Sequence, residues 1–151
     1  MKITRKYTLG IIGLGHMGTA IARGAVRKEY IERYKIAVYD HSEHAKNDCR
    51  IEGFDNLSSL KELVENSHIV LLAVRPQQVE EVLDEIKDYD IHTLLSIVTG
   101  VSIQHLQSRL NNAPIIRSMP NTPLQINEGA TALCKSENCK AYDYDFVFQL
   151  F

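Results

Sequence analysis

Tryptophan is absent from this sequence of 151 residues, which holds only three cysteines and four prolines. Cys49, Cys134 and Cys139 are odd in number and badly spaced for a disulfide framework or a zinc site, so we expect reduced thiols in a cytoplasmic protein. No apolar run approaches the roughly 18 residues that a membrane-spanning helix needs. With 17 basic and 19 acidic residues, the net charge is −2 and there is no basic block, which argues against nucleic acid or an anionic membrane as a partner.

The first residues, MKITRKYTLGIIG, are basic and then apolar, which faintly resembles a signal peptide. Their apolar part is short, is broken by glycines and runs straight into a glycine motif. We therefore interpret this stretch as the first strand of a cytoplasmic protein.

Apolar runs of strand length alternate with segments of helical period along the chain. The expected strands are residues 7–12, 35–39, 69–74, 93–98 and 114–119, with 130–134 as one more. The expected helices begin at about residue 16 and near 58–66, 77–86 and 102–110. Strands that are apolar on both faces and separated by amphipathic helices predict a Rossmann-like, doubly wound α/β fold, with a mainly parallel sheet and helices on both faces. Ligands in such folds bind at the carboxyl ends of the strands.

The last residues differ from the rest. AYDYDFVFQLF indicates a helix with a strongly apolar face, and a bare apolar face at a chain end needs a cover. We interpret residues 1–135 as a nucleotide-binding Rossmann domain, and 136–151 as a connecting helix or the start of a truncated C-terminal helical domain. Continuation of the natural protein is favoured over a partner that covers this face.

A glycine motif of the form GxGxxG follows the first expected strand and opens the first expected helix, at Gly13, Gly15 and Gly18. The first glycine permits a tight turn, the second lets the backbone approach a pyrophosphate, and the third lets the helix pack closely on the strand. The free N–H groups of the helix start attract phosphates. Because the motif lies in strand–turn–helix context, it indicates a dinucleotide site rather than a merely glycine-rich turn.

The second expected strand is followed by Asp40, about 20 residues after the motif, where an acidic residue normally accepts the ribose 2′-OH and favours NAD. His41, Ser42 and Lys46 could instead donate to a 2′-phosphate if Asp40 turned away. Asp40 could also be a turn residue or helix cap. The sequence therefore leaves the choice between NADP and NAD open.

The remaining polar residues indicate less. His41 and His44 lie three positions apart in a polar segment, where a solvated surface is favoured over a metal site. His68, His92 and His105 are interpreted as structural, so no metal site is predicted. No Ser/His/Asp set or carboxylate pair is evident by spacing, and no catalytic residue is assigned.

Four segments together resemble the pyrroline-5-carboxylate reductase family: GLGHMGTAI (13–21), AVRPQQV (73–79), SIVTGVSI (96–103), and IIRSMPNTP (115–123) leading to EGATAL (128–133). The Met-Pro-Asn-Thr-Pro elbow is the most specific of them. The resemblance runs from about residue 8 to 134 and covers only the family's N-terminal, dinucleotide-binding half. It departs from the family at Arg75, where lysine is usual, at Gly18 and Thr99, where alanine is common, and at Asp40, where many members have a basic or small polar group.

The resemblance implies an oxidoreductase that reduces 1-pyrroline-5-carboxylate to proline with NADP or NAD as cofactor, in proline biosynthesis. It implies a homo-oligomer formed through the second domain, which also supplies most substrate contacts, so this chain alone is expected to be inactive. Prolines in the elbow fix φ and lower the entropy of the loop, which suits a segment that holds the nicotinamide. The implied cofactor contacts, together with those of the glycine turn, are Gly13, Gly15, His16, Met17, Gly18, Asp40, His41, Asn56, Ala73, Val74, Arg75, Pro76, Thr99, Gly100, Met119, Pro120 and Asn121.

Two alternatives stay open at this point. One is a reductase-like regulatory module that binds NAD(P)H without catalysis. The other is a relative of the β-hydroxyacid dehydrogenases, which share the GLGxMG start but lack the MPNTP elbow.

Overall fold

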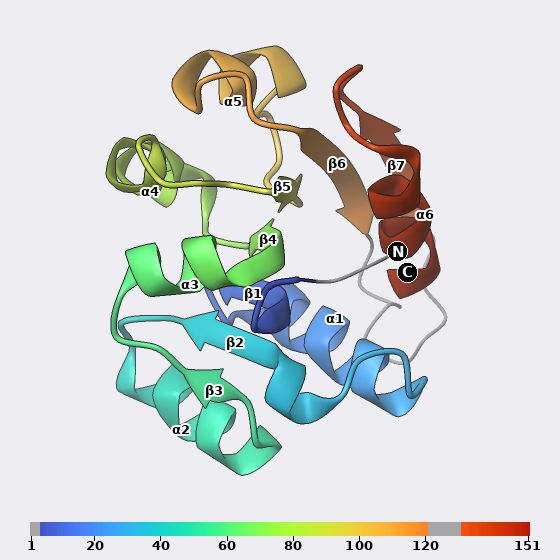
Figure 1. Cartoon of the computed structure of the whole chain (residues 1–151). Coiled ribbons are helices and arrows are strands. Elements are labelled where there is room, and N and C mark those ends of the chain that lie inside the picture. The colour runs from blue at the N-terminus through green and yellow to red at the C-terminus, as the bar shows by residue number, and fades with distance from the viewer. Residues whose placement is uncertain (1–3, 121–130) are drawn as a thin grey trace.

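The computed structural model describes residues 4–120 and 131–151. Within these residues, seven strands form one sheet in the order β3-β2-β1-β4-β5-β6-β7, parallel except for the antiparallel pair β6–β7 (Figure 1). The strands are β1 (Tyr7–Ile12), β2 (Ile36–Tyr39), β3 (Asp55–Asn56), β4 (Ser67–Leu72), β5 (Thr93–Ser96), β6 (Ile115–Pro120) and β7 (Thr131–Lys135). The helices are α1 (His16–Arg27), α2 (Glu43–Glu52), α3 (Leu60–Asn66), α4 (Val79–Ile86), α5 (Ile103–Arg109) and α6 (Ala141–Leu150), with 3-10 turns at Arg33–Lys35 and Pro76–Gln78.

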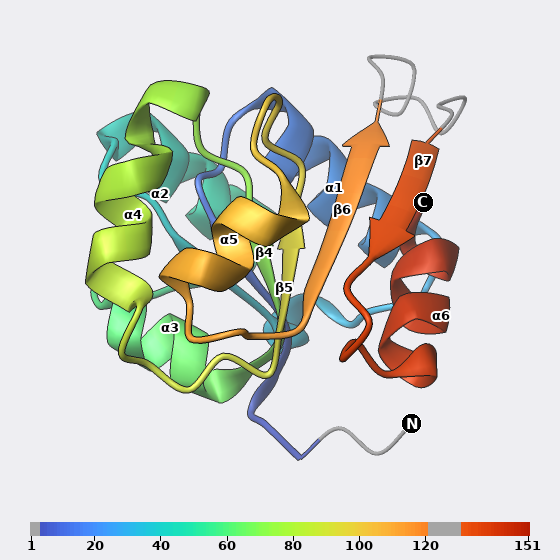
Figure 2. The same cartoon turned by 90° about the horizontal axis from the view of Figure 1, so that it is seen from above.

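The predicted doubly wound α/β fold is confirmed. Two apolar clusters cover the two faces of the sheet, one with α1, α2 and α6 and the other with α3, α4 and α5 (Figure 2). The central strands β1 and β4 are buried along their whole length, which explains why their apolar residues follow one another instead of alternating with polar ones. The chain order reverses between β1 and β4, and this switch point positions the site described below.

Two elements were not predicted as such. The segment after Asp40 is a full helix, α2, whose N-cap Ser42 accepts a hydrogen bond from the Ala45 N–H at 3.1 Å. The helix is mostly polar and buries only Ala45 and Cys49, so its apolar signal is weak. The edge strand β3 has two exposed residues and carries no apolar pattern at all.

The terminal helix α6 packs against α1 on one face of the sheet. Val147 and Leu150 are buried in the same cluster as β1, and the Tyr30 and Phe146 rings stack with their centroids 4.9 Å apart. Phe148 stays 64% exposed. Much of the apolar face of this helix is therefore covered within the chain itself, while the division into two domains at residue 135 stays a prediction.

No helix among residues 4–120 and 131–151 combines the length and apolarity that crossing a membrane requires.

The three cysteines are free thiols in different surroundings, which leads to a simple expectation. Cys49 and Cys139 are buried, and burial raises the pKa of each thiol to about 11, whereas Cys134 is exposed. Because the thiolate is the reactive form, iodoacetamide at pH 8 is expected to modify one cysteine in the folded chain and three after denaturation, counted by intact mass. Cys134→Ser should leave the folded chain unmodified; rapid double modification of that variant would contradict the described burial.

Candidate cofactor-binding site

The turn between β1 and α1 requires glycine at its first position. Gly13 has φ +94°, and its N–H donates to the Tyr39 carbonyl at 3.0 Å, which joins the turn to the end of β2. A Cβ added there would lie 2.9 Å from the Ala73 carbonyl oxygen. Neither the backbone conformation nor the space tolerates a side chain, because L-residues avoid positive φ.

The other two glycines of the motif have different surroundings. Gly15 is the N-cap of α1, and a Cβ added there meets no atom of the described residues within 4 Å. No side chain in the described part of the chain caps this twelve-residue helix at its start, and its first N–H groups can therefore bind an anion. Gly18 is buried, and a Cβ there would lie 2.6 Å from the Gly13 carbonyl oxygen. The motif predicts a different role for each glycine: Gly13 for the turn, Gly15 for the approach of a ligand, and Gly18 for helix packing.

A cavity of about 360 Å³ opens beside this turn, where β1, β2 and β4 end. Its volume lies in the range of small-molecule sites, and it occupies the switch point between β1 and β4. Its lining includes seven of the residues predicted from the sequence, namely Gly13, Gly15, Asp40, His41, Ala73, Val74 and Arg75. A backbone hydrogen bond of 2.9 Å from the Ala73 N–H to the Ile12 carbonyl fixes the β4 side of the cavity.

The carboxylate of Asp40 bonds to the backbone on both sides of the cavity mouth. Its Oδ2 accepts the Leu14 N–H at 2.8 Å, and its Oδ1 accepts the Ser42 N–H at 2.8 Å. Asp40 therefore joins the glycine turn to the start of α2, which is the turn-residue role left open above. Each oxygen retains a second lone pair, so the carboxylate still faces the cavity as an acceptor.

Part of the cavity lining was missed by sequence reasoning. Gln78, Glu81, Val82 and Glu85 lie on one face of α4 and its preceding turn, and Leu60 and Tyr39 also line the cavity. The first four positions have the i, i+3, i+4, i+7 spacing of one helical face. The apolar spacing in the sequence, at Val79, Val82, Leu83 and Ile86, predicts the helix but does not show that another of its faces borders an opening.

The remaining predicted contacts lie outside this cavity. His16 is exposed next to Gly15, Met17 packs against the core, and Pro76 is the first residue of a 3-10 turn. Asn56 is exposed on the edge strand β3.

A separate group of predicted contacts follows β5 and ends β6. Thr99 and Gly100 are exposed after β5, and Gly100 has φ +79°, while the backbone of Met119 and Pro120 ends β6. Arg117 donates to the Val98 carbonyl at 3.4 Å. Asn121, with the rest of the Met-Pro-Asn-Thr-Pro elbow, lies outside the described residues.

The glycine turn, the uncapped helix start and the cavity at the switch point define a dinucleotide-binding Rossmann domain. The chain belongs to the family described as NADP oxidoreductase, coenzyme F420-dependent, whose model matches residues 8–100.

The known proteins to which this chain is similar include reductases, in agreement with that class. It is 34% identical to a pyrroline-5-carboxylate reductase of Glycine max over 96% of this chain and 54% of that protein. A pyrroline-5-carboxylate reductase of Coxiella burnetii has the same fold with a TM-score of 0.89 and 25% identity, over 96% of this chain and 55% of that one. The Plasmodium falciparum pyrroline carboxylate reductase, solved with NADP bound, matches with a TM-score of 0.86 and 31% identity, over 100% of this chain and 55% of that one. The chain spans about half the length of the curated relatives it matches.

Proposed function

We propose that this chain is the cofactor-binding half of a pyrroline-5-carboxylate reductase, which reduces the C=N bond of 1-pyrroline-5-carboxylate to give proline. The observation that carries the proposal is the glycine turn beside a cavity at the switch point, in a chain similar to these reductases over nearly its whole length. The cofactor proposed is NADP or NAD. The expected setting is the cytoplasm, and the expected assembly is a homo-oligomer.

The residues present suit a dinucleotide. Open space at Gly15 admits a pyrophosphate to the uncapped start of α1, and the cavity beside Asp40 and His41 has room for the adenosine ribose. Arg75, exposed at the cavity rim, offers a positive charge to the phosphates. The far half of the cofactor would then extend over the carboxyl ends of β5 and β6, toward Gly100 and Met119.

The bound nicotinamide supplies a hydride, and the protein supplies position. Hydride transfer needs the two carbons about 3–3.5 Å apart and aligned, so rigid backbone at the ends of β5 and β6 would serve it. A protonated imine is already electrophilic, so no strong general acid is required of these residues. The groups that hold the substrate carboxylate are expected in the part of the relatives that this chain does not match.

The test uses the product of the native gene, with its intact mass measured first. NADPH and NADH consumption should depend on added 1-pyrroline-5-carboxylate, and proline should be formed in equal amount. The 151-residue chain is expected to bind the cofactor without turnover. If the native product binds the cofactor but forms no proline, the reductase proposal is refuted in favour of a regulatory module. If the native product does not bind the cofactor, both interpretations are refuted.

A further inference from the structure

Three potential ligand side chains meet at the edge of the sheet where β4 and β5 begin, opposite the cofactor cavity. They are His68 on β4, His92 directly before β5, and Asp143 in the first turn of α6. Their donor atoms all lie within 4.8 Å of one another. The three residues are far apart in sequence, so no ligand spacing could reveal them.

The distances suit a small cation. His68 Nε2 lies 2.8 Å from Asp143 Oδ1, and His92 Nε2 lies 3.3 Å from Asp143 Oδ2. Ligand atoms around a tetrahedral zinc ion lie roughly 3.3 Å apart, given metal–ligand bonds of about 2.0–2.1 Å. The 3.3 Å pair already has this spacing, and an ion bound by all three residues would require the other ligand atoms, which lie within 4.8 Å of one another, to move.

One of the three potential metal-ligand atoms has no hydrogen-bond partner among the described residues. His92 Nε2 is buried and makes no hydrogen bond within the described structure, although its carboxylate neighbour is 3.3 Å away. The two imidazole rings also lie close together, with centroids 4.1 Å apart. Two histidines and a carboxylate that converge without a complete hydrogen-bond set are the arrangement that a metal ion would satisfy.

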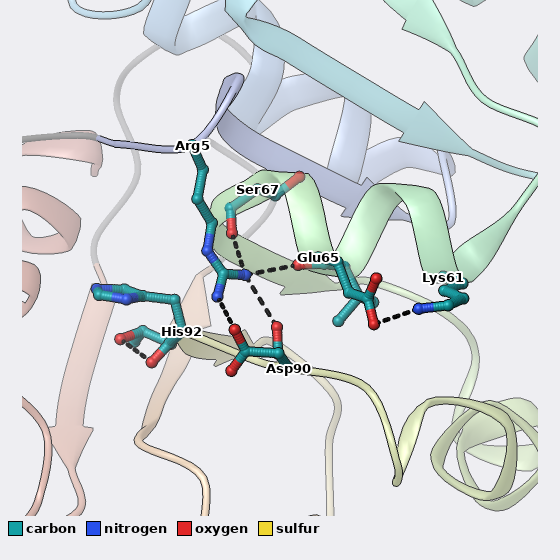
Figure 3. Close-up of polar contacts among 8 residues, drawn as sticks. Arg5, Lys61, Glu65, Ser67, Asp90 and His92 are labelled. Atoms are coloured by element: carbon teal, nitrogen blue, oxygen red, sulfur yellow. Dashed lines mark hydrogen bonds and ion pairs between the residues drawn. The ribbon is translucent and has the colours of Figure 1, made fainter.

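The surroundings support the ligands rather than compete with them. The Thr93 hydroxyl donates to Asp143 Oδ2 at 2.8 Å and orients the carboxylate. The nearby cation Arg5 is occupied: its Nη2 donates to Asp90 Oδ2 at 2.7 Å, and its Nη1 to carbonyls that include that of Asp90 at 2.9 Å (Figure 3). Lys140 also adds a positive charge near His92, but it is an exposed residue.

We propose that His68, His92 and Asp143 form a binding site for a divalent transition metal, with Zn²⁺ as the preferred ion and a solvent molecule as the fourth ligand. Such a site joins α6 to the starts of β4 and β5. It is separate from the cofactor cavity and independent of the proposed function.

The test is metal binding by the purified chain after treatment with EDTA. A hundredfold excess of Zn²⁺ over the dissociation constant should raise the melting temperature by roughly 5–10 °C, because ligands of the folded state stabilise it by mass action. Co²⁺ should give visible absorption bands of a tetrahedral site without the intense near-ultraviolet band of thiolate ligation. A thiolate band would assign the metal to a cysteine and overturn the proposal.

Variants locate the site. Asp143→Asn and His92→Gln should both abolish the Zn²⁺-dependent shift; His92 is 25% exposed, so its variant is the one expected to fold without difficulty. The matched control is His105→Gln, which breaks an exposed histidine–carboxylate pair with Glu80 of 2.6 Å and should keep the full shift. An unchanged shift in His92→Gln, or no shift in the parent chain, would refute the site.

Discussion

Replacing Gly15 by valine is expected to weaken NADPH binding at least 100-fold, or about 2.8 kcal/mol, while the fold is retained. The backbone at this position is extended, with φ −85° and ψ −161°, so valine fits the conformation. A Cβ there meets no atom of residues 4–120 or 131–151 within 4 Å. The added side chain therefore projects into the space where the pyrophosphate would approach the start of α1. Fluorescence titration with NADPH measures the affinity, and thermal unfolding measures the stability.

Substitutions at the other two glycines of the same turn should affect stability more than Gly15→Val does. Gly18→Ala places a methyl group 2.6 Å from the Gly13 carbonyl oxygen, and Gly13→Ala forces a side chain onto φ +94°. Both are expected to lower the free energy of unfolding, whereas Gly15→Val should cost at most about 1 kcal/mol as a poorer N-cap. Unchanged NADPH affinity in a folded Gly15→Val chain would place the pyrophosphate elsewhere.

Asp40→Ala is expected to weaken NADH and NADPH binding together, by about tenfold or more, and to destabilise the chain by about 1–2 kcal/mol. Two hydrogen bonds of 2.8 Å are lost, and with them the link between the glycine turn and the start of α2. A disordered turn affects both cofactors alike because both carry the same pyrophosphate. Titration of each cofactor and chemical unfolding of the variant test the two parts.

Glu43→Ala is the matched control for Asp40. It removes one negative charge from the same segment, and among the described residues the Glu43 side chain forms an ion pair with Lys46 at 3.0 Å and no other hydrogen bond or ion pair. Its binding and stability should stay near those of the parent chain. A selective loss of NADH binding in Asp40→Ala, with NADPH binding kept or improved, would show instead that Asp40 acts mainly on the ribose 2′-OH.

The fold could be predicted because its signals are local. Strands β1, β4 and β5 are short apolar runs, and α4 shows helical spacing at Val79, Leu83 and Ile86, all of them buried. The elements α2 and β3, which bury few residues, were missed. A periodic pattern of apolar residues arises only where one face of an element is buried, and an exposed edge strand has no such pattern. Boundaries shifted by a few residues for a related reason, because β4 begins at Ser67, where a polar residue is buried.

The candidate site, like the fold, could be predicted from the sequence only in part. The glycine motif could be read from the sequence because the turn, the helix start and the close packing are all made within one short segment. The order of the strand ends decides which face of α4 borders the cavity. It also decides which N–H groups donate to the two oxygens of Asp40.

The sequence by itself therefore determined the fold class, the family likeness and the glycine turn, since propensity, periodicity and turn chemistry act between near neighbours in the chain. Only the tertiary structure decided that Asp40 bonds to two backbone N–H groups, that α6 packs against α1, and that His68, His92 and Asp143 meet. These contacts join residues distant in sequence, and their free energy depends on geometry that exists only after the sheet has formed.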